Sequence, residues 1–69
     1  MTTKQLREIC DPIFDQHPHW LTNHEAERAL RRELTEAVLK QAGPFLRSVS
    51  NCVNQEMLRR ALLAIRQGR

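Results

Sequence analysis

The chain has few of the features that accompany secreted, membrane or sheet-containing proteins. Its two cysteines, Cys10 and Cys52, are too few for a disulfide framework, so we expect both to be reduced, small core residues. No run approaches the roughly 18 apolar residues of a membrane span, and no charged and apolar leader opens the sequence. β-Branched residues are scattered without alternation, so strands are not expected. We therefore expect a cytoplasmic protein with no membrane role.

Catalytic and metal-binding signatures are also missing. The chain contains no nucleophile-elbow serine, no glycine-rich phosphate loop and no C-x-x-C pair. A length of 69 residues corresponds to one small helical domain, residues 1–69, which offers little room for a deep cleft. We therefore expect no enzyme, no cofactor, no metal and no small-molecule substrate. A zinc- or redox-responsive site built from Cys10, Asp15, His17, His19 and His24 is a weaker alternative, because their spacing is not that of a zinc finger.

Basic residues exceed acidic ones by eleven to eight, giving a formal net charge of +3. Nine of the eleven are arginines and only two are lysines. Arginine binds carboxylate and phosphate groups with two parallel hydrogen bonds, so the bias favours an anionic partner. A GC-rich coding bias explains the same composition equally well.

Helical periodicity and punctuation run through the whole chain. We predict a short helix over 3–10, and a second one beginning at Asp11–Pro12, because aspartate suits the cap and proline the first helical position. Pro18 interrupts the helix. The strongest prediction is a long central helix over about 23–42, which starts at a capping box formed by Thr22 and Glu25 and stops at Gly43.

The last third has apolar residues at helical spacing, with a break between Asn51 and Asn54. Because Asn54 suits a helix cap, two helices over 45–52 and 54–67 are slightly favoured over one long helix. The fold class is therefore all-α, a compact bundle of four or five short helices around the long central one.

The junction over 35–53 has the pattern of a helix-turn-helix. Val38 and Leu39 would pack the first helix, Gly43 would form the turn, and Val49 with Cys52 or Val53 would hold the second helix. Several side chains left on the exposed side are of types that contact bases, and basic residues of the preceding helix suit phosphates. The expected base-contacting residues are Arg47, Ser48, Asn51 and Gln55, and the expected phosphate-contacting residues are Lys40, Arg31 and Arg32. A plain helical corner joined by glycine and proline explains the same pattern.

The last helix has an apolar arc wider than one side of a bundle needs, flanked by Arg59, Arg60 and Arg66. Such an arc indicates dimerisation or docking to a partner, although a helix at the centre of the bundle explains it equally well. Trp20 is either a core residue or an anchor for a partner. The expected partner-binding residues are Trp20, Met57, Leu58, Leu62 and Ile65.

Together these features predict a small, non-enzymatic DNA-binding regulator that uses the helix-turn-helix and forms a homodimer through its last helix. The alternative is a helical interaction module, an inhibitor or adaptor that occupies a protein partner, of a size and composition found among proteins of phages and mobile elements.

Overall fold

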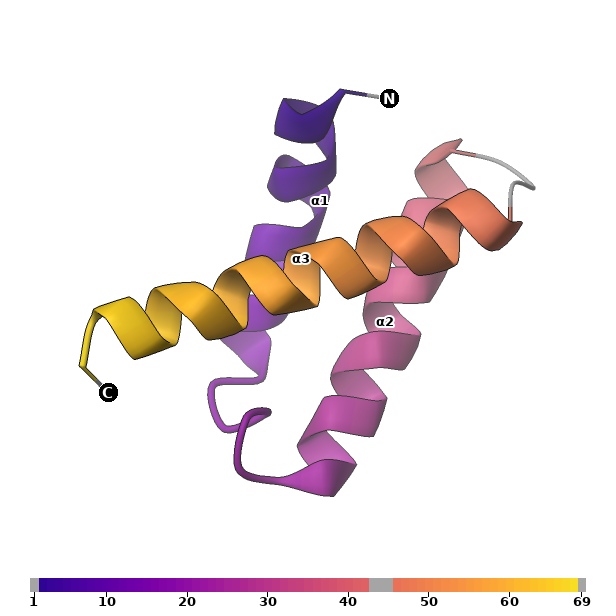
Figure 1. Cartoon of the computed structure of the whole chain (residues 1–69). Coiled ribbons are helices and arrows are strands. Elements are labelled where there is room, and N and C mark those ends of the chain that lie inside the picture. The colour runs from indigo at the N-terminus through magenta and orange to yellow at the C-terminus, as the bar shows by residue number, and fades with distance from the viewer. Residues whose placement is uncertain (1, 43–45, 69) are drawn as a thin grey trace.

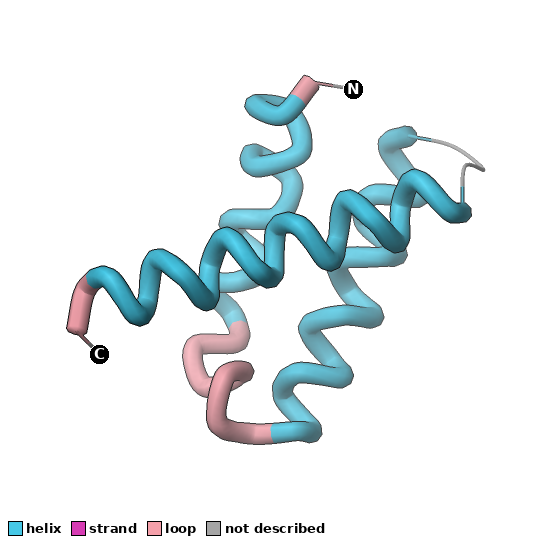
Figure 2. Tube along the Cα trace, in the orientation of Figure 1, coloured by secondary structure: helices cyan, strands magenta, loops and turns pink. Residues whose placement is uncertain are grey.

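The computed structural model describes residues 2–42 and 46–68, and for residues 42 and 46–48 it describes the backbone alone. These residues form three α-helices: α1 (Thr3–Gln16), α2 (His24–Ala42) and α3 (Leu46–Arg66). Helices α1 and α2 lie side by side and run antiparallel, and α3 crosses both of them (Figure 1). The only other described segments are the loop between α1 and α2 and short chain ends (Figure 2). The all-α class is confirmed, but the predicted number of four or five helices is wrong.

Helix α1 is one continuous helix, where the sequence predicted a break at Asp11–Pro12. Leu6, Cys10 and Phe14 are spaced four residues apart and are all buried, so the face that packs on the core continues past Pro12. The proline ring is exposed, and the missing backbone hydrogen bond is offset by the burial of Phe14 in the following turn. Asp11 does not cap a helix, because its carboxylate binds α3 instead.

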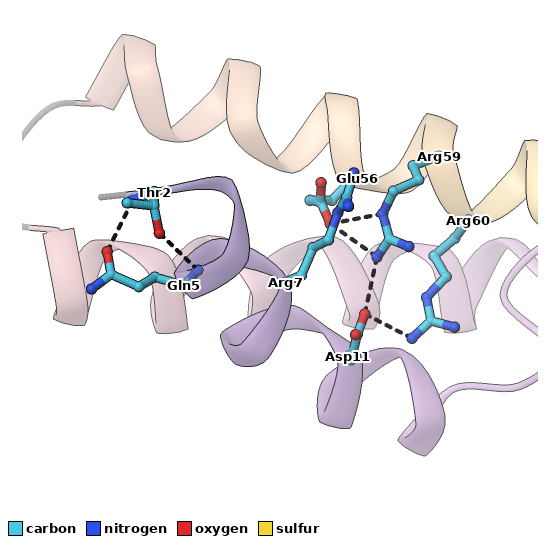
Figure 3. Close-up of polar contacts among 7 residues, drawn as sticks. All are labelled: Thr2, Gln5, Arg7, Asp11, Glu56, Arg59 and Arg60. Atoms are coloured by element: carbon cyan, nitrogen blue, oxygen red, sulfur yellow. Dashed lines mark hydrogen bonds and ion pairs between the residues drawn. The ribbon is translucent and has the colours of Figure 1, made fainter.

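The first turn of α1 is held by a capping box that the sequence reading did not anticipate. The Thr2 hydroxyl oxygen accepts a hydrogen bond from the Gln5 backbone N–H at 3.2 Å, and the Gln5 side-chain oxygen accepts one from the Thr2 backbone N–H at 2.9 Å (Figure 3). Two backbone donors of the helix start are thereby satisfied.

Helix α2 matches the central helix predicted over 23–42, but its cap is a different residue. The Asn23 side-chain oxygen accepts hydrogen bonds from the backbone N–H groups of Glu25 (2.9 Å) and Ala26 (3.2 Å). The Thr22 hydroxyl donates to the His19 carbonyl at 3.4 Å and takes no part in a capping box. Asparagine is as good a cap as threonine, so the helix starts one residue later than the capping-box pattern implied.

Helix α3 is a single helix, so the predicted break between 52 and 54 is wrong. Val49, Val53 and Met57 are spaced four apart and all buried, and this face requires the helix to continue without interruption. Asn54 is exposed and serves as an interhelical partner, since its side-chain oxygen accepts a hydrogen bond from Arg31 Nη1 at 2.6 Å.

The core lies where the three helices meet. Its buried members are Leu6, Cys10, Phe14, Leu30, Leu34, Val38, Val49, Val53 and Met57. The loop after α1 closes over one end of it: Trp20 packs half-buried with its ring centroid 5.8 Å from that of Phe14, and His17 hydrogen-bonds to Glu33 of α2. Neither cysteine is bridged. None of the helices in 2–42 and 46–68 combines the length and the apolar content that crossing a membrane requires.

Candidate docking surface on the third helix

A network of ion pairs holds α3 across α1. Glu56 is a buried glutamate, with 4% of its surface exposed, and its carboxylate accepts a hydrogen bond from Arg59 Nε at 3.0 Å. Arg59 Nη2 and Arg60 Nη2 both donate to the Asp11 carboxylate of α1, at 3.0 and 2.8 Å (Figure 3). Arg7 Nε lies 3.9 Å from the Glu56 carboxylate. These contacts neutralise Glu56 internally and fix the direction in which Arg59 points.

Arg59 and Arg60 both face α1 through Asp11, and their side chains are 22% and 28% exposed. Burial lowers the pKa of Arg59, but its hydrogen bonds and charge interactions with Glu56 and Asp11 outweigh burial and raise it overall. Its Nη1 has no hydrogen-bond partner among the residues that the structure describes. The Arg60 guanidinium lies 5.1 Å from the centroid of the Phe14 ring, so Arg60 packs on the core. Arg59 lines the groove beside Leu58 and Leu62, and Arg60 does not.

The cysteine and histidine side chains have different surroundings. Burial first, and then the charges of Glu56 and Asp11, raise the pKa of the Cys10 thiol to about 11, so it is protonated at neutral pH and is a poor nucleophile. His17 is held by Glu33, whereas His19 and His24 are exposed. Within 2–42 and 46–68, no three His, Cys, Asp or Glu side chains are grouped so that they could hold a metal ion.

An apolar stripe lies on the solvent-facing side of α3. It consists of Leu58, Leu62 and Ile65, whose surfaces are 61, 52 and 71% exposed. Positions i, i+4 and i+7 of a helix lie on one face, so the three side chains form a continuous strip. The C-terminal half of α3 extends past α1, so this strip is not covered by the other two helices (Figure 1). Leu58 and Leu62 also line a shallow groove, together with Gln55, Arg59, Leu63 and Arg66.

Arginine side chains follow one edge of the stripe. Arg59 and Arg66 are seven residues apart, which places them two turns apart on the same side of the helix, about 10 Å along its axis. Residues 46–69 contain five arginines and a single acidic residue, Glu56, for a formal charge of +4. Residues 1–45 contain six basic and seven acidic residues, for a formal charge of −1. Because Glu56 is buried and paired, the described solvent face of α3 is apolar and basic without an exposed carboxylate.

The partner-binding residues expected from the sequence fall into two groups. Leu58, Leu62 and Ile65 share the exposed stripe. Met57 is instead buried in the core, because it lies on the opposite face of α3 with Val53, and Trp20 packs on Phe14 in the loop after α1.

The residues expected to contact DNA are spread over two helices. Asn51 and Gln55 are exposed on α3, and Lys40 and Arg32 are exposed on α2. The side chains of the other two α3 residues of this set, Arg47 and Ser48, lie outside the described part of the structure.

Arg31 of α2 belongs to the same expected set, but its guanidinium already contacts side chains of this chain. Its Nη1 donates to Asn54 at 2.6 Å, and its Nη2 lies 3.5 Å from the Glu27 carboxylate. The contact with Asn54 joins α2 to α3, whereas the contact with Glu27 lies within α2.

Sequence reasoning missed the Asp11 and Glu56 network, whose partners are far apart in the chain. One local signal was present, since Glu56 and Arg59 are spaced three residues apart on one helix. Nothing local connects Asp11 with Arg59, 48 residues away. Comparison of the chain with protein-family models, with curated proteins and with solved structures gives no match, so the site is interpreted from its own geometry.

Proposed function

We propose that this chain is a non-enzymatic helical interaction module that binds a protein partner through the solvent face of α3. The observation that carries the proposal is the stripe of Leu58, Leu62 and Ile65, each more than half exposed on one helix face. Single exposed apolar residues are ordinary on protein surfaces, but a contiguous row of large ones marks an interaction site.

The stripe can contribute appreciable binding free energy. Full burial of a leucine or isoleucine side chain stabilises by about 1.5–3 kcal/mol, so covering the exposed parts of three contributes about 3–5 kcal/mol. The partner's own apolar side chains contribute a similar amount. The two contributions together can offset the loss of translational and rotational freedom on association. The rest of the domain supports this role, because α1 and α2 hold α3 from the opposite side through Val49, Val53 and Met57.

A comparison of matched variants tests the proposal. The wild-type chain, the Leu58→Gln/Leu62→Gln double variant and the Arg28→Gln control are immobilised and exposed to lysate from the source cells. Arg28 is exposed on α2 and does not belong to the stripe. We expect a protein that is retained by the wild type and the control and lost from the double variant. Equal retention by all three, or retention by none, would refute binding through α3.

Nucleic-acid binding is the second candidate function, and a different observation favours it. Helices α2 and α3 are separated by three residues, and α3 crosses α2, as in a helix-turn-helix. The first half of α3 exposes Ser50, Asn51 and Gln55, residue types that contact base edges, within a segment of positive charge. This candidate leaves the stripe of Leu58, Leu62 and Ile65 unexplained, which is why it ranks second.

Fluorescence anisotropy of a labelled random-sequence duplex tests this second function. A DNA-binding chain should bind at micromolar concentration, lose affinity steeply with added salt, and lose it again in the Asn51→Ala/Gln55→Ala variant. Absence of binding at low salt would remove nucleic acid from consideration. Binding that is equal in the Asn51→Ala/Gln55→Ala variant would place the contact elsewhere than on α3.

A further inference from the structure

The partner that fits α3 can be specified further from the charges that border the stripe. Arg59 and Arg66 lie along one edge of the stripe. Arg59 is paired with Glu56 and Asp11, whereas Arg66 is exposed and has no carboxylate partner among the described residues. A protein segment that covers the stripe must lie against this arginine edge. Carboxylates at matching positions would pair with the guanidinium groups, whereas lysine or arginine there would be repelled.

Arg59 is prepared for such a contact by the network beneath it. Glu56 and Asp11 occupy its Nε and Nη2 and hold the guanidinium in place, while Nη1 has no partner among the described residues. A guanidinium that is already fixed loses less conformational freedom when it binds a carboxylate than a freely rotating one. Arg66 makes no ion pair within the described residues, and it lies two turns further along the same edge.

We propose that the solvent face of α3 binds an acidic amphipathic helix, whose apolar side chains cover Leu58, Leu62 and Ile65 and whose carboxylates pair with Arg59 and Arg66. This inference rests on the proposed protein-binding function and specifies its partner. The two arginines are seven residues apart, so the partner helix needs two acidic residues about 10 Å apart along one edge.

The charge distribution also argues against a second copy of this chain as the occupant. Residues 46–69 carry a formal charge of +4, and Asp11 of α1 offsets one of these charges by pairing with Arg59 and Arg60. Pairing two α3 faces would still bring two positive segments together. The single carboxylate of α3, on Glu56, is buried and already paired, so it cannot offset this repulsion. An acidic helix removes the repulsion and adds attraction.

A display library of 20-residue helical peptides tests the proposal on the full chain. The library fixes leucine at positions i, i+3, i+4 and i+7 of one face and randomises the flanking positions. We expect the selected peptides to be enriched in aspartate and glutamate along one edge, at positions seven residues apart. Their affinity should fall about three- to tenfold in the Arg66→Glu variant, and it should also fall with added salt. The matched control is Arg28→Glu on α2, which makes the same charge change away from the stripe and should leave affinity within about twofold.

The possible outcomes separate this inference from the function on which it rests. Peptides that depend on Leu62 but carry no acidic bias would overturn the acidic partner and leave protein binding by α3 intact. If no peptide is selected, the acidic helix is again overturned, and the Leu58→Gln/Leu62→Gln capture comparison still decides the broader function. A salt-resistant dimer of the chain at micromolar concentration, abolished by Leu62→Gln, would show that the occupant is a second copy.

Discussion

Replacing Glu56 with glutamine removes the one buried negative charge of α3 while keeping the shape of the side chain. A hydrogen bond to a charged group contributes about 1.5–3 kcal/mol when both partners are shielded from water. Arg59 has 22% of its side chain exposed and keeps Asp11 as a partner, so solvent screening reduces the expected loss to about 1–2 kcal/mol. In a domain of this length such a loss lowers the melting temperature by roughly 4–16 °C.

Urea unfolding, followed by far-ultraviolet circular dichroism and by Trp20 fluorescence, measures this loss. The matched control is Glu36→Gln, since Glu36 is an exposed glutamate on α2 that makes no ion pair within the described residues. We expect the control to change the free energy of unfolding by no more than about 0.5 kcal/mol. If Glu56→Gln costs no more than Glu36→Gln, then the network does not stabilise the packing of α3 on α1.

A double-mutant cycle assigns the loss to the pair. Glu56→Gln and Arg59→Gln are combined, and the free energies of unfolding of the two single variants and the double variant are compared. Because the two side chains are in direct contact at 3.0 Å, we expect a coupling of about 0.5–2 kcal/mol. Strict additivity of the two losses would contradict the contact.

Three further predictions concern stability elsewhere in the fold. Asn23→Ala should lower the free energy of unfolding by about 1 kcal/mol and Thr22→Ala by a few tenths at most, because only Asn23 caps α2. Thermal unfolding of the two variants measures the difference, and a larger loss in Thr22→Ala would show that Thr22 is the cap. In urea unfolding, Leu34→Ala should lower the free energy of unfolding by about 2–5 kcal/mol and Leu62→Ala by less than about 1 kcal/mol, since Leu34 is fully buried and Leu62 is half exposed. Similar losses would mean that Leu62 is covered in the isolated chain. The pKa of Cys10 is raised by burial from its ordinary value of 9.0 to about 11, so between these pH values the unfolded chain loses the thiol proton while the folded chain keeps it. The Cys10 thiol should therefore lower the free energy of unfolding by about 2 kcal/mol from pH 9 to 11. The decline should be smaller in Cys10→Ala, and equal declines would exclude Cys10 as the cause.

Features that depend on local spacing could be predicted from the sequence. The central helix over 23–42 follows from apolar residues at helical intervals and from Gly43 after its end, and α2 has these bounds within one residue. The all-α class follows from the same periodicity and from the absence of alternating strands.

Features that depend on the competition between local and tertiary effects could not be predicted. Pro12 and Asn54 are both signals of a helix boundary, yet each lies inside a continuous helix. In both places the buried face continues on either side of the signal, through Cys10 and Phe14 in α1 and through Val53 in α3. Core packing therefore overrides the local preference for a helix boundary. The sequence shows this preference, but it does not show the tertiary packing that opposes it.

The candidate site was predicted only in part, for a similar reason. The apolar arc of the last helix was visible as a pattern, but the pattern alone does not separate the buried Met57 from the exposed Leu58. That separation depends on the direction in which α3 crosses α1 and α2. The fixed position of Arg59 depends on Asp11, which is 48 residues away, and one sequence gives no information about such a pair.

The contacts of α1 with α2 join residues closer in sequence than the contacts of α1 with α3, and this affects the order of folding. His17 and Glu33 are 16 residues apart, whereas Asp11 and Arg59 are 48 apart, so closing the first contact costs less chain entropy. We expect the α1–α2 hairpin to form on the folding pathway before α3 docks on α1. Glu56→Gln should then increase the unfolding rate and leave the refolding rate near that of the wild type in stopped-flow experiments, and an equal slowing of refolding would contradict this order. The lifetime of the folded chain would accordingly be governed by how long α3 stays in place, and a partner bound to α3 that strengthens its docking would prolong that lifetime.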